Sequence, residues 1–313
     1  MNENSMINIE DPMLKEALKT CLTEEYKVNE NQLSKNNLTG ITKLTAKNKD
    51  IKNLNGIEYC INLTELNLDR NNITDISPIK ELKSLTYLSL YKNNIADITP
   101  LSKLYNLKEL YLGDNKYIKN ISPIVNLTQL NRLFLGGNSI NNIESLKNLT
   151  NLQAISLYRN NITDISPLEN LTKLKEIFLG GNKIQDISSL KNFTELIELN
   201  LWGNNISDIN PLKNLKKVNV LALYSNQISD ISSLENTEVN ETLSFVNNKL
   251  NEDSDKNMKV LNNMYENDKL KNCENLFLIG NGLNFKEGSE HRRIIEKIID
   301  SGIKVFFKKG NMH

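Results

Sequence analysis

The sequence has five cysteine and histidine side chains that could supply a thiol nucleophile, an imidazole base or a soft metal ligand: Cys21, Cys60, Cys273, His291 and His313. A cysteine–histidine catalytic pair or a zinc site requires such residues at matching positions. The cysteines are too few and too scattered for a zinc site or a disulfide framework, and spacing pairs neither histidine with a carboxylate or thiol. Each cysteine falls at a position expected to face the core, so we expect all three to be reduced and buried. The pattern predicts no catalytic residue and no metal site.

The glycine pairs Gly136-Gly137 and Gly180-Gly181 lack the features of a phosphate-binding loop, because no Lys-Ser and no helix start follows them. Lysine plus arginine equals aspartate plus glutamate at 38 each, which argues against nucleic acid or an anionic membrane as a partner. No apolar stretch approaches the roughly 20 residues needed to insert into a membrane. We therefore expect a protein that has no cofactor and is not an enzyme.

A repeat of 22 residues organises most of the chain. In the unit that starts at Leu63, apolar residues occupy positions one, four and six, and Asn71 occupies position nine. The same string restarts at Leu85, Leu107, Leu130, Leu152, Leu174, Leu196 and Val218, always 22 residues on except after Leu107, where the spacing is 23. The alternation predicts a short strand whose positions four and six face a core. The repeat predicts an α/β leucine-rich-repeat fold: a right-handed solenoid with a parallel sheet on the concave face and a mostly 3-10 or irregular convex side.

Two further positions of the repeat have a physical role. Position nine is asparagine in all eight regular units, and its amide is expected to satisfy backbone groups where the chain leaves the strand. A second position holds five of the six prolines, which suits a tight turn or a 3-10 segment. These residues are Asn71, Asn93, Asn115, Asn138, Asn160, Asn182, Asn204 and Asn226, and Pro78, Pro100, Pro123, Pro167 and Pro211.

The two ends differ from the middle, as a solenoid with exposed core at both ends requires. Residues 1–40 are predicted to form a helical cap, with Asp11-Pro12 starting one helix and a second helix over 29–38 ended by Gly40. Residues 41–239 are predicted to form the repeats, the first of which is degenerate and has Lys49 at position nine. Residues 240–313 are predicted to form longer units that contain true helices, over 254–267 and from Ser289 to Gly302.

Positions three, five and seven of each strand point away from the core, onto the concave face. In the seven units that start at 85 to 218, eight of these 21 positions are aromatic, although aromatic residues make up only 6% of the chain. We expect these rings to be exposed anchors for a partner protein, with Gly113, Gly136, Gly180 and Gly203 leaving shallow recesses between them. The predicted partner-binding residues are Tyr87, Tyr91, Tyr111, Phe134, Tyr158, Phe178, Trp202 and Tyr224. Two alternatives remain: the rings stack to stiffen the sheet, or they form a platform for a glycan.

The segment Asp164-Ile165-Ser166-Pro167-Leu168, together with the front cap that reads Ile9-Glu10-Asp11-Pro12, resembles the internalin family of bacterial leucine-rich-repeat proteins. The resemblance covers residues 7–239 and implies binding of a host or surface protein on the concave face. A second, weaker resemblance is to phosphatase regulators with similar repeats, which would make the chain an intracellular scaffold. As written, the sequence shows no signal peptide and predicts a cytoplasmic protein, with secretion or a cell-surface location as the alternative. We expect a monomer.

Overall fold

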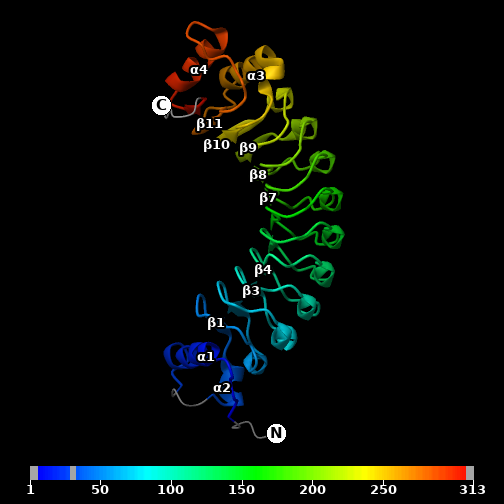
Figure 1. The fold of residues 1–313 in the computed structure, drawn as a ribbon, viewed down its shortest axis with the longest axis vertical. Helices are drawn as coiled ribbons and strands as arrows, with labels where there is room; N and C mark the ends of the chain where they lie inside the picture. Colours follow the sequence, from blue (N-terminus) through cyan, green and yellow to red (C-terminus); the bar gives the residue numbers. More distant parts are fainter. Residues whose placement is uncertain (1–5, 29–32, 308–313) are drawn as a thin grey trace. The chain divides into compact units, whose positions relative to one another are not determined.

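The computed structural model describes residues 6–28 and 33–307. Contacts divide the chain into two compact units, Met1–Asn160 and Asn161–His313. The domain boundaries predicted from the sequence, after residues 40 and 239, remain predictions. Each unit is built from leucine-rich repeats, with short parallel strands on one side and 3-10 turns on the other (Figure 1).

The first unit contains two helices, then strands that alternate with 3-10 turns. Its helices are α1 (Pro12–Glu24) and α2 (Lys35–Gly40). Its strands are β1 (Lys43–Thr45), β2 (Glu65–Asn67), β3 (Tyr87–Ser89), β4 (Glu109–Tyr111), β5 (Arg132–Phe134) and β6 (Ala154–Ser156). Its 3-10 turns are η1 (Ile57–Tyr59), η2 (Ser77–Glu81), η3 (Thr99–Leu101), η4 (Ser122–Ile124) and η5 (Glu144–Leu146). Consecutive strands pair in parallel and in sequence order.

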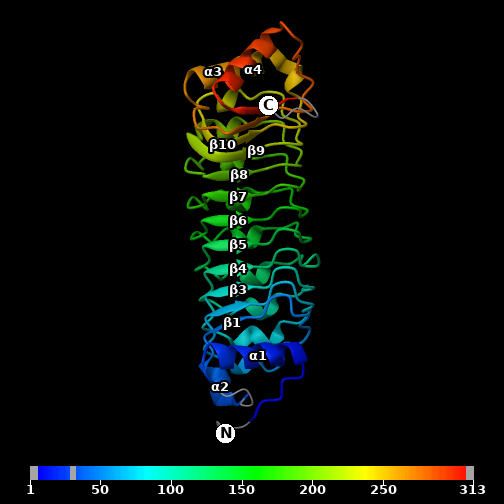
Figure 2. The same ribbon diagram turned by 90° about the vertical axis from the view of Figure 1, so that its left-hand side faces the viewer.

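The second unit continues the pattern and then changes it. Its strands are β7 (Glu176–Phe178), β8 (Glu198–Asn200), β9 (Lys217–Ala222), β10 (Glu238–Ser244), β11 (Asn275–Phe277) and β12 (Lys304–Phe306). Its 3-10 turns are η6 (Ser166–Leu168), η7 (Ser188–Leu190), η8 (Asn210–Asn214), η9 (Ser232–Leu234) and η10 (Leu250–Asp253). Its helices, α3 (Ser254–Glu266) and α4 (Glu290–Asp300), lie in the last two repeats, as Figure 2 shows. Because β11 and β12 extend the parallel pairing from β10, residues 240–307 continue the repeats rather than forming a separate sandwich.

The core consists of the repeated apolar positions. In the repeat that contains β3, Leu88 and Leu90 face the core and are fully buried, whereas Tyr87 is only half-buried. Each coil contributes the same set of leucines and isoleucines, so the core runs through each unit without interruption. Every one of the five shared prolines lies in the first turn of a 3-10 segment, as predicted.

The predicted asparagine ladder is present. The amide nitrogen of Asn160 donates to the carbonyl oxygens of Leu135 and Leu157, both at 3.0 Å, and its oxygen accepts from the Ile140 N–H at 2.9 Å. Each amide thus links its own strand end to the preceding coil, and it satisfies backbone groups that water cannot reach. Asn138 is the exception, because its oxygen Oδ1 is buried without a hydrogen-bond partner among the described residues. Asn138 follows the 23-residue spacing, where the extra residue brings Lys116 into a left-handed conformation with φ +61°.

The N-terminal cap differs from its prediction in one helix. Asp11 caps α1 as expected, because its side chain accepts from the N–H groups of Met13 and Leu14. Its other oxygen accepts from Lys52 and Asn53 of the first coil, which fastens the cap to the repeats. The second helix was predicted over 29–38 but spans only Lys35–Gly40, with Ser34 as its N-cap; residues 29–32 lie outside the described part of the chain.

The two C-terminal helices begin where the sequence predicts them. Ser289 caps α4 by accepting from the Arg292 N–H, and Ile295 and Ile298 on the inner side of this helix are fully buried. Within residues 6–28 and 33–307, none of the helices is both long and apolar enough to cross a bilayer.

Candidate functional site

Strand register places the predicted aromatic residues on one side of the sheet in each unit, which we call the strand face. It consists of positions three, five and seven of each strand. At position five, Ser89 pairs with Tyr111 and Tyr111 with Phe134. All eight predicted aromatic residues lie on this face, and all are half-buried rather than exposed. The rings are therefore less exposed than expected, and their role as partner-binding residues stays a prediction.

In the first unit, rings on successive strands lie against one another, one pair tilted and the other stacked. The ring centroids of Tyr87 and Tyr111 are 5.5 Å apart, and those of Tyr111 and Phe134 are 4.9 Å apart with an interplanar angle of 19°. The guanidinium of Arg132 lies over the Phe134 ring at 5.4 Å. The result is a continuous row of π surfaces across three strands, stabilised by stacking as well as by burial.

The Tyr111 hydroxyl has a fixed orientation. It donates a hydrogen bond to the carboxylate of Glu109 at 2.7 Å, on the same strand. Burial first, and then this hydrogen bond to the anionic Glu109, raises the pKa of Tyr111 to about 12. The phenol therefore remains protonated at neutral pH and serves as a fixed donor rather than as a base.

In the second unit, Trp202 and Tyr224 form an almost parallel stack, with ring centroids 5.6 Å apart and an interplanar angle of 4°. Phe178 occupies position five of β7 and pairs in register with Asn200. Two neighbouring rings at position seven and one at position five thus form an apolar surface that extends over several strands.

Aromatic rings of neighbouring strands lie over the glycines at position seven and fill the space that a side chain would occupy there. A Cβ atom at Gly136 would lie 2.2 Å from the Tyr158 ring, and one at Gly180 would lie 2.2 Å from the indole nitrogen of Trp202. A Cβ atom at Gly113 would lie 3.2 Å from the Tyr91 ring, which is still a tight contact. The recesses predicted at Gly113, Gly136 and Gly180 are therefore wrong, because a ring of a neighbouring strand lies over each of these glycines.

Two aromatic residues on the strand face escaped the prediction. Phe277 at position five of β11 and Phe306 of β12 pair in register and stack, with centroids 4.4 Å apart and an angle of 9°. The sequence could have predicted Phe277 on this face. Positions one, four, six and nine of its repeat are Cys273, Leu276, Leu278 and Asn281, which makes Phe277 position five. The strand face of the second unit therefore carries a second ring stack in the helix-containing repeats.

The residues with catalytic potential form no reactive set. All three cysteines are free and buried, as predicted. Burial raises the pKa of the Cys21 thiol to about 12 and that of Cys273 to about 11, and it raises the pKa of Cys60 further. A thiol held neutral in this way is a poor nucleophile.

His291 has a partner that spacing did not reveal. Its Nε2 lies 2.9 Å from Asp255 Oδ1, which joins α4 to α3 across 36 residues of sequence. The statement that no carboxylate pairs with His291 is therefore wrong, since the pairing depends on helix packing. His313 lies outside the described residues. In the described ranges 6–28 and 33–307, no three His, Cys, Asp or Glu side chains come together in a way that could hold a metal ion.

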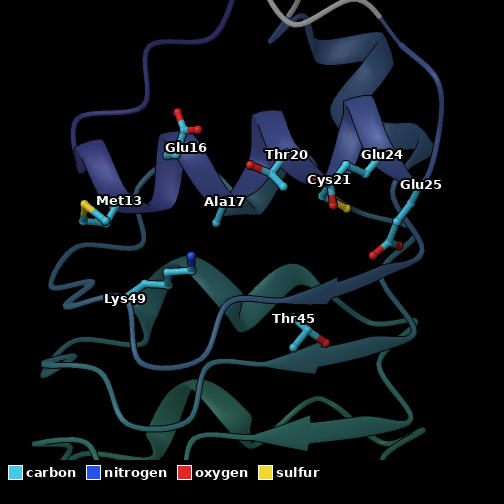
Figure 3. A pocket seen from close by; sticks show the side chains of 9 residues that line it. All are labelled: Met13, Glu16, Ala17, Thr20, Cys21, Glu24, Glu25, Thr45 and Lys49. Atoms are coloured by element: carbon cyan, nitrogen blue, oxygen red, sulfur yellow. The ribbon is translucent and has the colours of Figure 1, made fainter.

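A cleft of about 200 Å³ separates α1 from the first coil. Figure 3 shows the Lys49 side chain extending toward α1, with Ala17 pointing from α1 toward the coil and Glu16 pointing away from it. The cleft follows from the docking of the cap on a coil with lysine at position nine. It contains no nucleophile that is both accessible and ionised, because Cys21 beside it is buried.

Comparisons with known proteins agree with this architecture. The family "Leucine Rich repeats (2 copies)" matches residues 61–103, 83–126, 150–192 and 194–236. The chain is similar to the crystal structure of an internalin (inlF) from Listeria monocytogenes, with 31% identity and a TM-score of 0.70, covering 96% of this chain and 95% of that one. It is also similar to internalin C2 (inlC2) from the same organism, with 38% identity and a TM-score of 0.63, covering 67% of this chain and 93% of that one.

A more distant likeness shows the fold alone. The ectodomain of the Arabidopsis thaliana receptor kinase GASSHO1/SCHENGEN3, solved in complex with CASPARIAN STRIP INTEGRITY FACTOR 2, is 22% identical with a TM-score of 0.64. The match covers 89% of this chain and 36% of the receptor chain. Among curated proteins, no sequence matches the chain significantly.

Proposed function

Because this chain belongs to the internalin family of leucine-rich-repeat proteins, we propose that it binds a partner protein through the aromatic residues of its strand face and catalyses no reaction. Leucine-rich-repeat proteins of this kind are protein-interaction modules, and their fold is generally a non-catalytic scaffold. The observation that carries the proposal is the Trp202–Tyr224 stack, which keeps two large rings partly accessible where the coil requires no apolar residue.

The proposed contact residues are the eight aromatic residues predicted from the sequence. Their half-buried state supports both anchoring and stacking, since a ring can stack on one side and contact a partner on the other. Rings held over Gly136 and Gly180 lose little conformational entropy when a partner binds, because their rotamers are already restricted. Aromatic anchors that are rigid before binding are typical of high-affinity protein surfaces.

A glycan is the second candidate ligand. Its support is the stack formed by Tyr111 and Phe134, because flat rings side by side could also contact the apolar faces of sugars. The mixed charges on the strand face, such as Asp69, Glu109 and Arg132, favour a protein partner whose own charges fix the orientation of binding. A monomeric state, and a cytoplasmic rather than an exported location, remain predictions.

The test is a comparative capture experiment with the intact chain immobilised. The wild type, the double variant Trp202→Ala/Phe178→Ala and the control Lys213→Glu on η8 are exposed to the same protein extract and the same glycan array. We expect proteins that the wild type and the control retain and that the double variant loses, with circular dichroism showing that all three are folded. Retention that is equal in all three, or glycans as the main ligands, would contradict the proposal.

A further inference from the structure

Large apolar side chains recur on the strand face of the last repeats, between polar residues such as Thr242, Ser244 and Asn275. We call this set the C-terminal strand patch; its members are Val220, Tyr224, Val246, Phe277, Ile279 and Phe306, and all six are half-buried. Among the described residues of the units from β7 to β12, the charged residues at positions three, five and seven are only Glu176, Glu198 and Lys304. Position seven of the last unit is Lys308, which lies outside the described residues.

Backbone pairing shows that the members of the patch are neighbours. At position seven, the Gly203 N–H donates to the Tyr224 carbonyl at 2.9 Å, and the Ser225 N–H donates to the Val246 carbonyl at 2.7 Å. The next step along this row is the hydrogen bond from the Asn247 N–H to the Ile279 carbonyl at 2.8 Å. At position five, Phe277 of β11 pairs with Phe306 of β12, so the apolar side chains at positions five and seven adjoin at β11.

The repeat does not require these side chains to be apolar. In the repeat that contains β2, position five is Asn67 and position seven is Asp69. The coil therefore also forms with polar residues at these positions. Contiguous apolar surface that folding does not need is typical of a binding surface.

Acidic groups border the patch along one edge. Glu198 at position three of β8 lies opposite Val220 and also pairs in register with Glu176. Burial raises the pKa of Glu198, and the negative charges of Glu176 and Glu241 raise it further. Glu241 is thus a second acidic neighbour of Glu198. Among the described residues, no lysine, arginine or histidine lies within ion-pair distance of Glu198. The Glu241 carboxylate accepts a hydrogen bond from Asn219 at 3.1 Å.

We propose that the C-terminal strand patch binds a basic, apolar segment of the partner protein, with one lysine or arginine between Glu198 and Glu241 and large apolar side chains on Val246, Phe277 and Ile279. This inference rests on the proposed function, that the strand face binds a protein. A cation from the partner relieves the repulsion among the carboxylates while its apolar neighbours remove the patch from water. Lys304 lies at the opposite end of the patch and disfavours a second basic group there.

The experiment selects peptides on the intact chain from a phage-displayed library of random 12-residue sequences. Synthetic versions of the selected peptides, made without tryptophan, are then titrated by the fluorescence of Trp202, the only tryptophan in the chain, which stacks on Tyr224. The variants are Glu198→Gln, which keeps the shape of the side chain, Val246→Asp within the patch, and the control Lys213→Glu.

We expect selected peptides to combine lysine or arginine with neighbouring aromatic or aliphatic residues. Glu198→Gln is expected to weaken binding about tenfold, Val246→Asp at least about tenfold, and Lys213→Glu not at all. Raising NaCl from about 0.05 M to about 0.5 M is expected to weaken binding to the wild type more than to Glu198→Gln.

Three outcomes would overturn the proposal. Selected peptides without basic residues that still depend on Trp202 or Phe178 would refute it and leave the proposed function standing. Failure to select any peptide would refute both. Self-association of the chain that Val246→Asp abolishes, measured by analytical ultracentrifugation, would show that a second copy occupies the patch instead.

Discussion

The indole ring of Trp202 lies over Gly180, so that a Cβ atom at this glycine would come within 2.2 Å of the indole nitrogen. The two residues belong to neighbouring coils and occupy the same position, position seven of their repeats. The absence of a side chain in one coil therefore makes room for the largest side chain in the next.

Gly180→Ala is expected to displace the indole and to lower the free energy of unfolding by about 1–3 kcal/mol, as overpacking does. The displacement should change the emission of Trp202 because no other tryptophan contributes. Gly40→Ala is the control, since a Cβ there meets no atom within 4 Å. Unchanged emission and stability in Gly180→Ala would contradict the placement of the ring.

Trp202→Ala is expected to affect both stability and binding. The ring is half-buried and stacks on Tyr224, so its removal should lower the melting temperature. Removal of a fully exposed side chain would leave the melting temperature almost unchanged. Binding of the partner should weaken by about 2 kcal/mol, roughly thirtyfold, if Trp202 is an anchor. Trp202→Phe retains a ring and should recover most of the stability. A loss of stability with unchanged binding would favour stacking as the sole role of the ring.

Asn160→Ala and Asn138→Ala test the asparagine ladder. Loss of the Asn160 amide removes the acceptor of the Ile140 N–H and one hydrogen bond to each of the Leu135 and Leu157 carbonyls, at an expected cost of about 1–3 kcal/mol. Asn138→Ala should cost less, because the oxygen of Asn138 accepts no hydrogen bond. The neighbouring exposed Asn161→Ala is the control, and denaturant unfolding is the measurement. Equal stability of all three variants would show that the hydrogen bonds of the asparagine ladder contribute no measurable free energy of unfolding.

The cysteines are expected to react only when the protein unfolds. Burial raises the pKa of all three thiols, to about 12 for Cys21 and about 11 for Cys273, so almost no thiolate exists in the folded state at pH 8. A thiol reagent should therefore label the native chain slowly, and the denatured chain rapidly and three times per molecule. Rapid native labelling at Cys60, which is fully buried, would be the clearest contradiction.

Glu198→Gln is expected to raise the melting temperature slightly at pH 7. The pKa of Glu198 is raised from its ordinary value of 4.5 in the folded state, so ionisation favours the unfolded state. The stability that the protonated carboxyl contributes is present below pH 4.5 and is lost as the pH rises through the higher folded pKa. The variant cannot ionise, so its advantage should be seen at pH 7 and vanish near about pH 3. A lower melting temperature at pH 7 would mean that Glu198 already has a stabilising cation.

The sequence alone was sufficient for the fold of each unit and for which side chains lie on the strand face. Each coil must bury the same positions against its neighbours. The spacing of Leu66, Leu68 and Asn71 within the repeat therefore predicts that these side chains are buried. The helix that starts at Ser289 was equally clear, because its cap and its buried isoleucines are local features.

The tertiary structure alone decided how side chains from different coils meet. The fit of Trp202 over Gly180, the pairing of His291 with Asp255 and the unpaired oxygen of Asn138 each depend on distances between segments that are remote in sequence. A repeat pattern assigns a side chain to a face, but it does not specify the rotamer or the neighbour. Those follow from close packing of adjacent coils, in which one side chain takes the space that another leaves.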